Sequence, residues 1–287
     1  MLDLKLYESH DENAWCPGCG NFGILDAIKN AVAELEIKPE DIVMVSGIGQ
    51  AAKTPHYIRA NVFNGLHGRA LPPAQAIKMA NKDLKVIITG GDGDAYGEGG
   101  NHLLHAMRRN VDMTQLVHDN QIYGLTKGQG SPTTARGQKT SMQFEGVQSE
   151  PMQPLALAIT LGATFVARGF SGDKEGLKEI IKAAINHKGY AIIDIMQPCV
   201  TFNKINTFKW YKDRCYRLDE SYDPTNKMAA LQKAFEFGDE GIPLGILYKE
   251  EGKPTFNDLH PVISSSKPLV DRQWKPQDVE PFVDQFL

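Results

Sequence analysis

One short turn carries the residues whose types point most directly to chemistry. Residues 90–101 read GGDGDAYGEGGN and follow the apolar run LKVIIT at 84–89. A strand that leads into a glycine-rich turn and then a helix is typical of a phosphate site, because glycines let backbone N–H groups approach the phosphate. Asp92 stands between two of these glycines, where its charge would repel a phosphate. A divalent cation removes this conflict, since Mg²⁺ accepts carboxylate, carbonyl and phosphate oxygens in one octahedral shell.

Such a cation needs further protein oxygens, and a second segment offers them. The sequence HDNQIYG at 118–124 follows the next apolar run along the chain. Asn120 has a side-chain carbonyl, and an irregular turn here can present the backbone carbonyl of Ile122. The sequence therefore predicts a magnesium site made by Asp92, Asn120 and Ile122.

The cysteines form the second candidate site. The chain has four of them, Cys16, Cys19, Cys199 and Cys215, and the first two belong to a CPGC motif. A chain of 287 residues without an export signal is unlike the small secreted proteins that depend on disulfides. Reduced thiols that hold a metal or do redox work are the favoured interpretation.

The elements that must position these residues alternate along the chain. Apolar periodicity predicts helices over 22–36, 72–82, 101–110, 154–162 and 173–188, and strands over 41–47, 84–89, 113–119, 164–169 and 190–196. This alternation, with continuously apolar strands, predicts an α/β fold with a doubly wound, mostly parallel sheet. In such sheets ligands bind beyond the carboxyl ends of the strands, which is where the unusual residues follow.

Composition limits the domain organisation and the classes of partner. Regular patterning weakens after residue 197, so we expect one domain over 1–220 and a C-terminal extension over 221–287 that packs on the core or on a partner. The net charge of -4 gives no reason to expect nucleic acid. No apolar run approaches the roughly 20 residues that cross a bilayer. We expect a cytoplasmic protein that binds neither nucleic acid nor a membrane.

The spacing of the magnesium residues resembles a cofactor motif. GDG, then 26 residues, then Asn120 is similar to the thiamine diphosphate motif, whose common form has a second asparagine where this chain has Gln121. The resemblance implies that Asp92, Asn120 and the Ile122 carbonyl hold Mg²⁺ on the diphosphate. It also implies a set of cofactor-binding residues: Ile48, Gly49, Gln50, Ala51, His67, Gly91, Gly93, Asp94, Gly124 and Leu125.

Longer segments make the resemblance more specific. WCPGCGNFGIL, GIGQAAKTPHY, LHGRALPPAQAIKMANKDL, GDGDAYGEGGNH, RRNVDMTQLVHDNQIYGLTKGQGSPTT and QPCVTFN together resemble the beta subunit of 2-oxoacid:ferredoxin oxidoreductases, in the same order over roughly residues 10–215. The resemblance implies CoA-dependent oxidative decarboxylation of a 2-oxoacid to an acyl-CoA, with electrons passed to ferredoxin through an iron-sulfur cluster. It also implies an alpha subunit, which supplies the glutamate that activates the cofactor, in an (alpha-beta)2 assembly.

The iron-sulfur ligands are where this chain departs from the family. Family members hold a 4Fe-4S cluster with cysteines that correspond to Cys16, Cys19 and Cys199 and with a fourth cysteine in a GIGC turn, which here reads GIGQ and ends in Gln50. Four outcomes are open: a 4Fe-4S cluster with three thiolates and an oxygen or nitrogen ligand, a three-iron cluster, recruitment of Cys215, or no cluster. Cys215 lies in FKWYKDRCY, for which we predict a helix and an ordinary buried thiol.

The family resemblance also implies where substrate is chosen. The loop YGLTKGQ lies over the reacting carbon in the family, and members with a lysine here accept 2-oxoglutarate. Lys127, together with Lys53 of the AAKTP segment, is the candidate for the distal carboxylate, because a buried carboxylate needs a cationic partner. Leu125 is a candidate contact. The alternative is that both lysines are solvated.

The histidines have weaker patterns, and two rival functions stay open. His67 matches a family position beside the cofactor, where it would hold a phosphate oxygen or have only a structural role. His102 and His105 have the spacing of metal ligands but no third ligand.

One rival function is the subunit of a non-redox thiamine diphosphate-dependent 2-oxoacid decarboxylase, which needs no cysteines. The other is a nucleotide-binding or regulatory subunit that uses the glycine turn alone.

Overall fold

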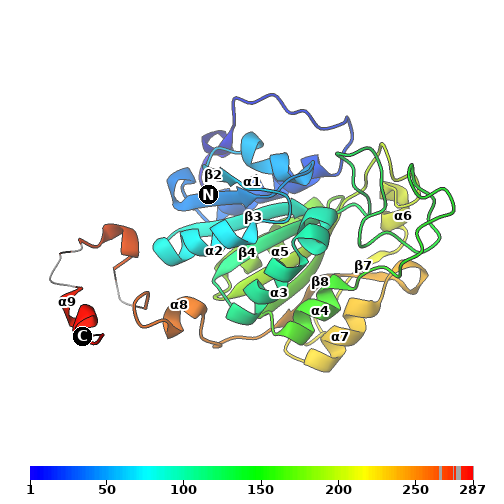
Figure 1. Ribbon diagram of the computed structural model, residues 1–287. Coiled ribbons are helices and arrows are strands. Elements are labelled where there is room, and N and C mark those ends of the chain that lie inside the picture. The colour runs from blue at the N-terminus through cyan, green and yellow to red at the C-terminus, as the bar shows by residue number, and fades with distance from the viewer. Residues whose placement is uncertain (265–266, 274, 276–278, 287) are drawn as a thin grey trace.

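A single sheet organises the chain in the computed structural model, which describes residues 1–264, 267–273, 275 and 279–286 (Figure 1). Its strands are β1 (Ile42–Ser46), β2 (Asn61–Asn64), β3 (Lys85–Gly91), β4 (Met113–Asp119), β5 (Phe165–Phe170), β6 (Tyr190–Met196), β7 (Cys215–Arg217) and β8 (Ile242–Lys249). They lie in the order β2-β1-β3-β4-β6-β5-β8-β7. Neighbouring strands are parallel except β5 and β8, which are antiparallel.

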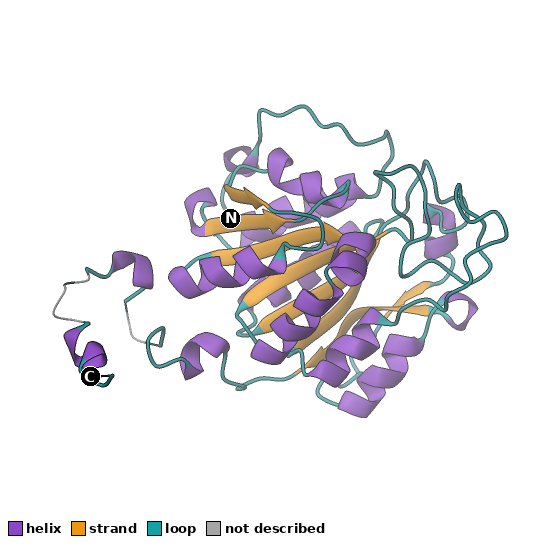
Figure 2. Cartoon of the chain, in the orientation of Figure 1, coloured by secondary structure: helices purple, strands orange, loops and turns teal. Residues whose placement is uncertain are grey.

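Helices cover both faces of this sheet, as Figure 2 shows. One face packs on α1 (Asn21–Glu34) and α5 (Lys174–Asn186), and the other on α2 (Leu71–Ala80), α3 (Gly100–Arg109), α4 (Pro154–Leu161) and α7 (Lys227–Phe235). The shorter helices are α6 (Phe208–Lys212), α8 (Phe256–Leu259) and α9 (Glu280–Val283). Among the described residues, no helix combines the length and the apolar composition that a membrane span requires.

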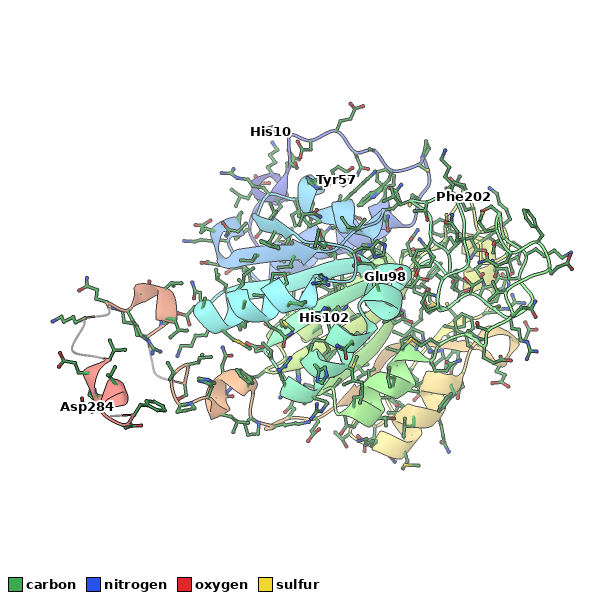
Figure 3. All side chains as sticks on the ribbon, viewed as in Figure 1. His10, Tyr57, Glu98, His102, Phe202 and Asp284 are labelled. Carbon is green, nitrogen blue, oxygen red and sulfur yellow. The ribbon has the colours of Figure 1, made fainter. Side chains whose placement is uncertain are left out.

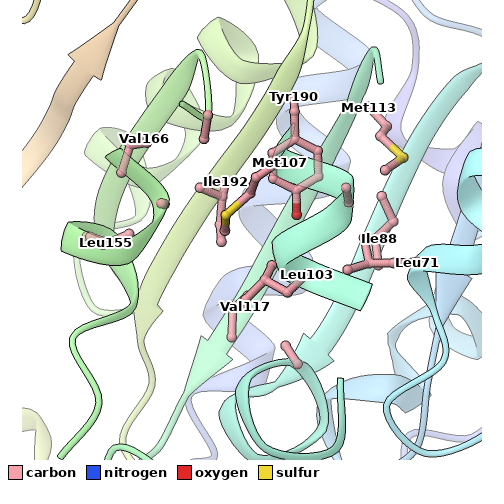
Figure 4. Close-up of a cluster of buried hydrophobic side chains, with 14 of the residues drawn as sticks. Leu71, Ile88, Leu103, Met107, Met113, Val117, Leu155, Val166, Tyr190 and Ile192 are labelled. Atoms are coloured by element: carbon pink, nitrogen blue, oxygen red, sulfur yellow. The ribbon is translucent and has the colours of Figure 1, made fainter. Parts of the chain in front are cut away.

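The core explains why the strands are apolar throughout. Along β1, Val43 and Val45 join the cluster under α2 and α3, while Ile42 and Met44 join the cluster under α1 and α5. Successive side chains of a strand point to opposite faces, so a strand buried on both faces needs apolar residues at every position. Figure 4 shows the first of these clusters around Ile88, Leu103 and Met107. The predicted α/β, doubly wound, mostly parallel sheet is confirmed.

The ten predicted helices and strands are present, with ends shifted by at most two residues, and the larger differences lie outside them. β2 was not predicted because its sequence, NVFN, is short and exposed along its whole length. Helix α6 ends at Lys212, so the prediction that Cys215 lies in a helix is wrong. Cys215 begins β7 because that segment pairs with β8, a contact from a distant part of the sequence that local periodicity cannot report.

The C-terminal part contributes to the sheet before it leaves the body. Strand β8 pairs with β5, and α7 packs against the cluster that contains α4. Helix α8 still contacts the body, since Phe256 packs against the cluster under α2 and α3 and Asn257 Nδ2 donates to Lys78 O at 3.1 Å. Helix α9 lies away from the sheet (Figure 1). The boundary at residue 220 stays a prediction, and part of the segment 221–287 lies outside the described residues.

Candidate active site

The order of the strands creates a crevice where the sequence places its unusual residues. The chain runs from β1 outward to β2, then returns to β3 on the other side of β1, so the strand order reverses between β1 and β3. A reversal of this kind opens a ligand crevice beyond the carboxyl ends of the strands. The turns after β1, β3 and β4 meet there and line a cavity with about 490 Å³ of empty space.

The structure brings the predicted cofactor and magnesium residues together around this cavity. Its lining contains all of them, with Tyr123 and Thr126 in addition: Ile48, Gly49, Gln50, Ala51, His67, Gly91, Asp92, Gly93, Asp94, Asn120, Ile122, Gly124 and Leu125. The first four follow β1, His67 follows β2, residues 91–94 form the end of β3 and the turn after it, and residues 120 and 122–126 follow β4. The predicted residues therefore share one site, although the chain separates them by up to 77 positions, as from Ile48 to Leu125.

Asp92 is a buried carboxylate held by hydroxyl groups. It is 1% exposed, and its Oδ2 accepts hydrogen bonds from Ser131 Oγ at 2.5 Å and from Thr133 Oγ1 at 2.7 Å. Burial raises the pKa of Asp92, and the two hydroxyl groups oppose that shift. A cation beside the carboxylate would lower this pKa. No role was predicted for Ser131 or Thr133, although the run SPTT follows the YGLTKGQG segment.

A second buried carboxylate shares the Thr133 hydroxyl. Thr133 Oγ1 lies 2.7 Å from Asp119 Oδ1 as well as 2.7 Å from Asp92 Oδ2. One hydroxyl hydrogen cannot serve two carboxylates at once. Burial, with the charges of Asp194 and Asp92, raises the pKa of Asp119 well above its usual value, which favours the protonated form of this carboxyl.

The oxygens around Asp92 suit magnesium. Asn120 and Ile122 line the same cavity, and Asn120 Oδ1 accepts the Ile122 N–H at 3.0 Å, which fixes this turn. Carboxylate, amide and backbone oxygens are the ligands that Mg²⁺ prefers, together with waters and phosphate. In the described part of the chain, no three His, Cys, Asp or Glu side chains converge on a point that would hold one metal ion. A site with a single carboxylate does not need such a group.

Three glycines leave the cavity free of side chains where the main chain lines it. Gly49 has φ +125°, and no atom of the described residues lies within 4 Å of a Cβ built there. A Cβ on Gly91 or Gly124 would meet its first neighbour only at 4.0 Å. Any other residue at these three positions would put a side chain into the cavity. This space fits a diphosphate that contacts main-chain N–H groups.

Asp94 ties two turns together. Its Oδ1 accepts N–H groups from Ile48 at 2.9 Å and Gly68 at 2.7 Å. His67 Nδ1 lies 3.4 Å from that oxygen and 3.2 Å from Glu98 Oε2, and Tyr123 donates its hydroxyl hydrogen to Glu98 at 3.2 Å. Glu98, labelled in Figure 3, thus links the turn after β3 to the segment after β2 and to the turn after β4. No local pattern pointed to Glu98 or Tyr123, because their contacts depend on the fold.

The predicted substrate residues lie outside the cavity lining, apart from Leu125. The loop from Tyr123 to Gln129 is closed by Tyr123 N–H to Gln129 O and Gly128 N–H to Tyr123 O, both at 2.9 Å. Lys127 is exposed in this loop with φ +76°, and Lys53 is half-buried in the turn after β1. Neither lysine makes an ion pair with the described residues. The left-handed backbone at Lys127 costs on the order of 1 kcal/mol or more.

Three of the four cysteines line a second, adjoining pocket. Cys16, Cys19 and Cys199 surround it together with Gln50, which also lines the first cavity. Cys215 is elsewhere, packed against the cluster of Phe170, Met196, Tyr211, Ile242 and Leu244. Burial raises the pKa of the Cys19 thiol to about 11 and that of Cys215 to about 12. Metal binding would have to displace the proton of Cys19.

Two protein-family models match the chain. Residues 43–195 match the model described as thiamine pyrophosphate enzyme, C-terminal TPP binding domain. Residues 199–265 match the model for the C-terminal region of the pyruvate ferredoxin oxidoreductase beta chain. The first match spans β1 to β6, including every turn that lines the cavity.

Known proteins similar to this chain carry related names. The 2-oxoacid:ferredoxin oxidoreductase subunit beta of Sulfolobus sp is 48% identical over 86% of this chain and 85% of its own length. The 2-oxoglutarate oxidoreductase subunit KorB of Mycobacterium tuberculosis is 45% identical over 69% of this chain and 53% of its own length. A solved 2-oxoglutarate:ferredoxin oxidoreductase from Magnetococcus marinus, with 2-oxoglutarate, coenzyme A and succinyl-CoA bound, superposes with a TM-score of 0.86 and 40% identity, over 89% of this chain and 87% of that one.

Proposed function

Because the chain belongs to the beta subunits of the 2-oxoacid:ferredoxin oxidoreductases, we propose that it binds the diphosphate of the cofactor in an enzyme that converts 2-oxoglutarate and CoA to succinyl-CoA and CO₂. The observation that carries this proposal is the single cavity lined by turns from three strands, with Asp92 buried at its wall. We propose 2-oxoglutarate, rather than another 2-oxoacid, as the substrate because similar proteins are named for it.

The chain's own residues would hold the cofactor rather than react with it. Thiamine diphosphate, when bound, supplies the nucleophilic carbon and the electron sink for the loss of CO₂. The open glycine positions 49, 91 and 124 leave room for the diphosphate. Mg²⁺ would be held on the phosphate oxygens by Asp92, Asn120 and Ile122. The hydrogen bonds that Asp94 accepts fix the turn after β3 against the turn after β1.

Specificity would come from the loop over the cavity. Leu125 lines the cavity and is 44% exposed, so it is free to contact a substrate. Lys127 lies two residues further on, and a lysine that has no carboxylate partner within the described residues is available to a dicarboxylate. Lys53, on the turn after β1, is the second candidate cation.

The cysteine pocket would be the electron exit. Cys16, Cys19 and Cys199 would hold an iron-sulfur cluster, which supplies one-electron transfer to ferredoxin when bound. Thiolates of a cluster bind different irons, so they need not converge on one point, as ligands of a single ion must. The pocket shares Gln50, Asn120 and Gly124 with the cofactor cavity, so the two groups would be neighbours.

The chain would act with an alpha subunit in the cytoplasm, as an (alpha-beta)2 assembly. The name beta subunit, carried by its relatives, supports a partner chain. The exposed loop over the cavity is a natural place for that chain to complete the site.

Reconstitution with the alpha subunit tests the proposal. The complex, supplied with thiamine diphosphate, Mg²⁺, CoA and 2-oxoglutarate, should form succinyl-CoA and pass two electrons to ferredoxin for each molecule formed. A non-redox decarboxylase is the second candidate rather than the first, because it does not need the cysteines that this chain has in the second pocket. Release of CO₂ with an aldehyde product, and without reduction of ferredoxin, would replace the proposal with that candidate.

A further inference from the structure

The pocket that holds the three cysteines contains an amide oxygen without a partner. Gln50 Oε1 is buried and accepts no hydrogen bond from the described residues. The main chain of Gln50 is firmly placed, since its carbonyl accepts Trp15 Nε1–H at 2.7 Å and the Lys53 N–H at 3.3 Å. A buried, unpaired acceptor costs roughly 1–3 kcal/mol. This cost is recovered only when a donor or a metal reaches the oxygen.

Two other amides of the pocket, Asn21 and Gln197, present hydrogens instead, and the Asn120 oxygen already accepts the Ile122 N–H. Asn21 is 1% exposed, its Oδ1 is engaged by His118 Nδ1 at 2.9 Å, and its Nδ2 has no acceptor among the described residues. Gln197 Nε2 lies 3.5 Å from Cys19 Sγ. The Asn21 and Gln197 donors suit sulfur atoms, and among the four amides that line the pocket only Gln50 has a buried oxygen that the described residues leave unpaired.

We propose that Gln50 Oε1 is the fourth protein ligand of a 4Fe-4S cluster whose other ligands are Cys16, Cys19 and Cys199. This inference rests on the proposed function for the presence of a cluster and deepens it by naming one iron that is bound through oxygen. Cys215 is not available for this role, because it packs in the cluster around Tyr211 and does not line the pocket. Trp15 fixes the Gln50 main chain, and the Gln50 side chain lines the same pocket as the three thiols.

The ligand set has two physical consequences. A neutral amide replaces a thiolate, so the cluster carries one negative charge fewer than a cluster with four cysteines, and its reduction potential should be higher. An amide oxygen is also a harder and weaker ligand for iron in a sulfide cluster than a thiolate is. One iron should therefore be released more easily than the other three.

The test uses the alpha-beta complex, with wild type, Gln50→Cys and Gln50→Ala chains purified without oxygen and reconstituted with iron and sulfide. Ferricyanide takes one electron from the 4Fe-4S cluster, which expels the unique iron as Fe²⁺ and leaves a three-iron cluster. Iron content and the electron paramagnetic resonance of the three-iron product are followed in time. Wild type should lose one iron of four, Gln50→Cys should keep all four and have a lower reduction potential, and Gln50→Ala should lose its iron several-fold faster than wild type.

Three results would overturn the inference. Wild type that loses iron as fast as Gln50→Ala would mean that water, rather than the amide, binds the iron. Wild type that resists ferricyanide as well as Gln50→Cys does would mean that a fourth thiolate is present. A wild-type complex without iron, beside a Gln50→Cys complex that holds a cluster, would mean that Gln50 does not serve as a ligand. Turnover of 2-oxoglutarate is assayed on the same samples, and its absence with the iron pattern intact would count against the proposed function alone.

Discussion

At the scale of single residues, Asp92 matters most to the proposed cofactor site. Its carboxylate is buried against two hydroxyl groups, and burial raises its pKa. We predict that Asp92→Asn leaves the fold intact, because asparagine keeps an oxygen that Ser131 and Thr133 can donate to. Mg²⁺-dependent binding of thiamine diphosphate by the complex should weaken by about 100-fold or more, since a charged ligand is lost.

Calorimetry of thiamine diphosphate binding at several Mg²⁺ concentrations measures this change. Asp83→Asn is the matched control, because Asp83 is exposed and does not line the cavity. Binding by Asp92→Asn with the affinity and the Mg²⁺ requirement of wild type would remove Asp92 from the metal site.

Lys127 gives a prediction about substrate choice. Replacement by methionine removes the charge while keeping the length of the side chain. The kcat/KM for 2-oxoglutarate should fall roughly 10- to 100-fold, the worth of one charged hydrogen bond, while pyruvate should be little affected. Lys139→Met, at another exposed lysine, should change neither substrate. Equal losses on both substrates would show that Lys127 supports the loop and does not select the acid.

Asp194 gives a pH dependence that concerns stability. Burial, only partly offset by Arg168 and by the Tyr96 hydroxyl, raises the pKa of Asp194 from 3.8 to about 6. Between these values the folded chain binds more protons at this site than the unfolded chain does. The free energy of unfolding therefore falls as pH rises from about 4 to 6 and the folded chain loses this proton. Asp194→Asn should therefore gain stability relative to wild type across that window. Urea titrations measure the free energy of unfolding of wild type and Asp194→Asn at pH 4 and pH 7. The same difference between the two chains at both pH values would refute the raised pKa of Asp194.

At the scale of elements, the turns after β1, β3 and β4 form the site through backbone shape. Gly49 and Gly252 both have positive φ, +125° and +79°, and in neither case does a described atom lie within 4 Å of an added Cβ. Alanine at either position should destabilise the chain by about 1 kcal/mol or more through backbone strain. Only Gly49→Ala should also weaken thiamine diphosphate binding, because Gly49 lines the cavity and Gly252 does not. Thermal unfolding measures the effect on stability, and titration with thiamine diphosphate measures the effect on binding. Similar cofactor affinity in both variants would contradict a role of Gly49 in the cofactor site.

The elements also show what the sequence could and could not predict. Asp92 was predictable because its charge conflicts with a phosphate, and β1, β3 and β4 were predictable because they are buried on both faces. Thr133 was not predictable as a partner of Asp92, since it lies 41 residues away in a long segment without helix or strand. Cys215 was misplaced for the same reason: its pairing partner in β8, Ile242, is distant in sequence. Local patterns report burial and turns, but contacts between turns appear only once the sheet is assembled.

At the scale of the whole molecule, an apolar edge beside the cavity points to the place of the partner chain. Val62 and Phe63 on the edge strand β2 are 55% and 45% exposed, and Leu66, next to the cavity residue His67, is 69% exposed. Exposed apolar residues gathered at an edge strand are typical of an interface. We predict that Leu66→Glu weakens association with the alpha subunit by about 10-fold or more.

Met228→Glu is the matched control, because Met228 is 68% exposed but lies on α7, which packs against α4 and β8 far from the edge strand β2. Sedimentation of mixed chains gives the dissociation constants. Equal association by the two variants and wild type would place the alpha subunit on another surface.

The most direct test of the proposed site is the contact between the metal and the cofactor. Mn²⁺ takes the same oxygen ligands as Mg²⁺ and is paramagnetic, so electron-nuclear double resonance of the Mn²⁺-loaded complex reports phosphorus nuclei bound through the metal. We predict phosphorus coupling when thiamine diphosphate is present, and its loss in Asp92→Asn. Thiamine diphosphate bound to the wild-type complex without phosphorus coupling to the metal would contradict the assignment of Asp92, Asn120 and Ile122 as the ligands that join the metal to the diphosphate.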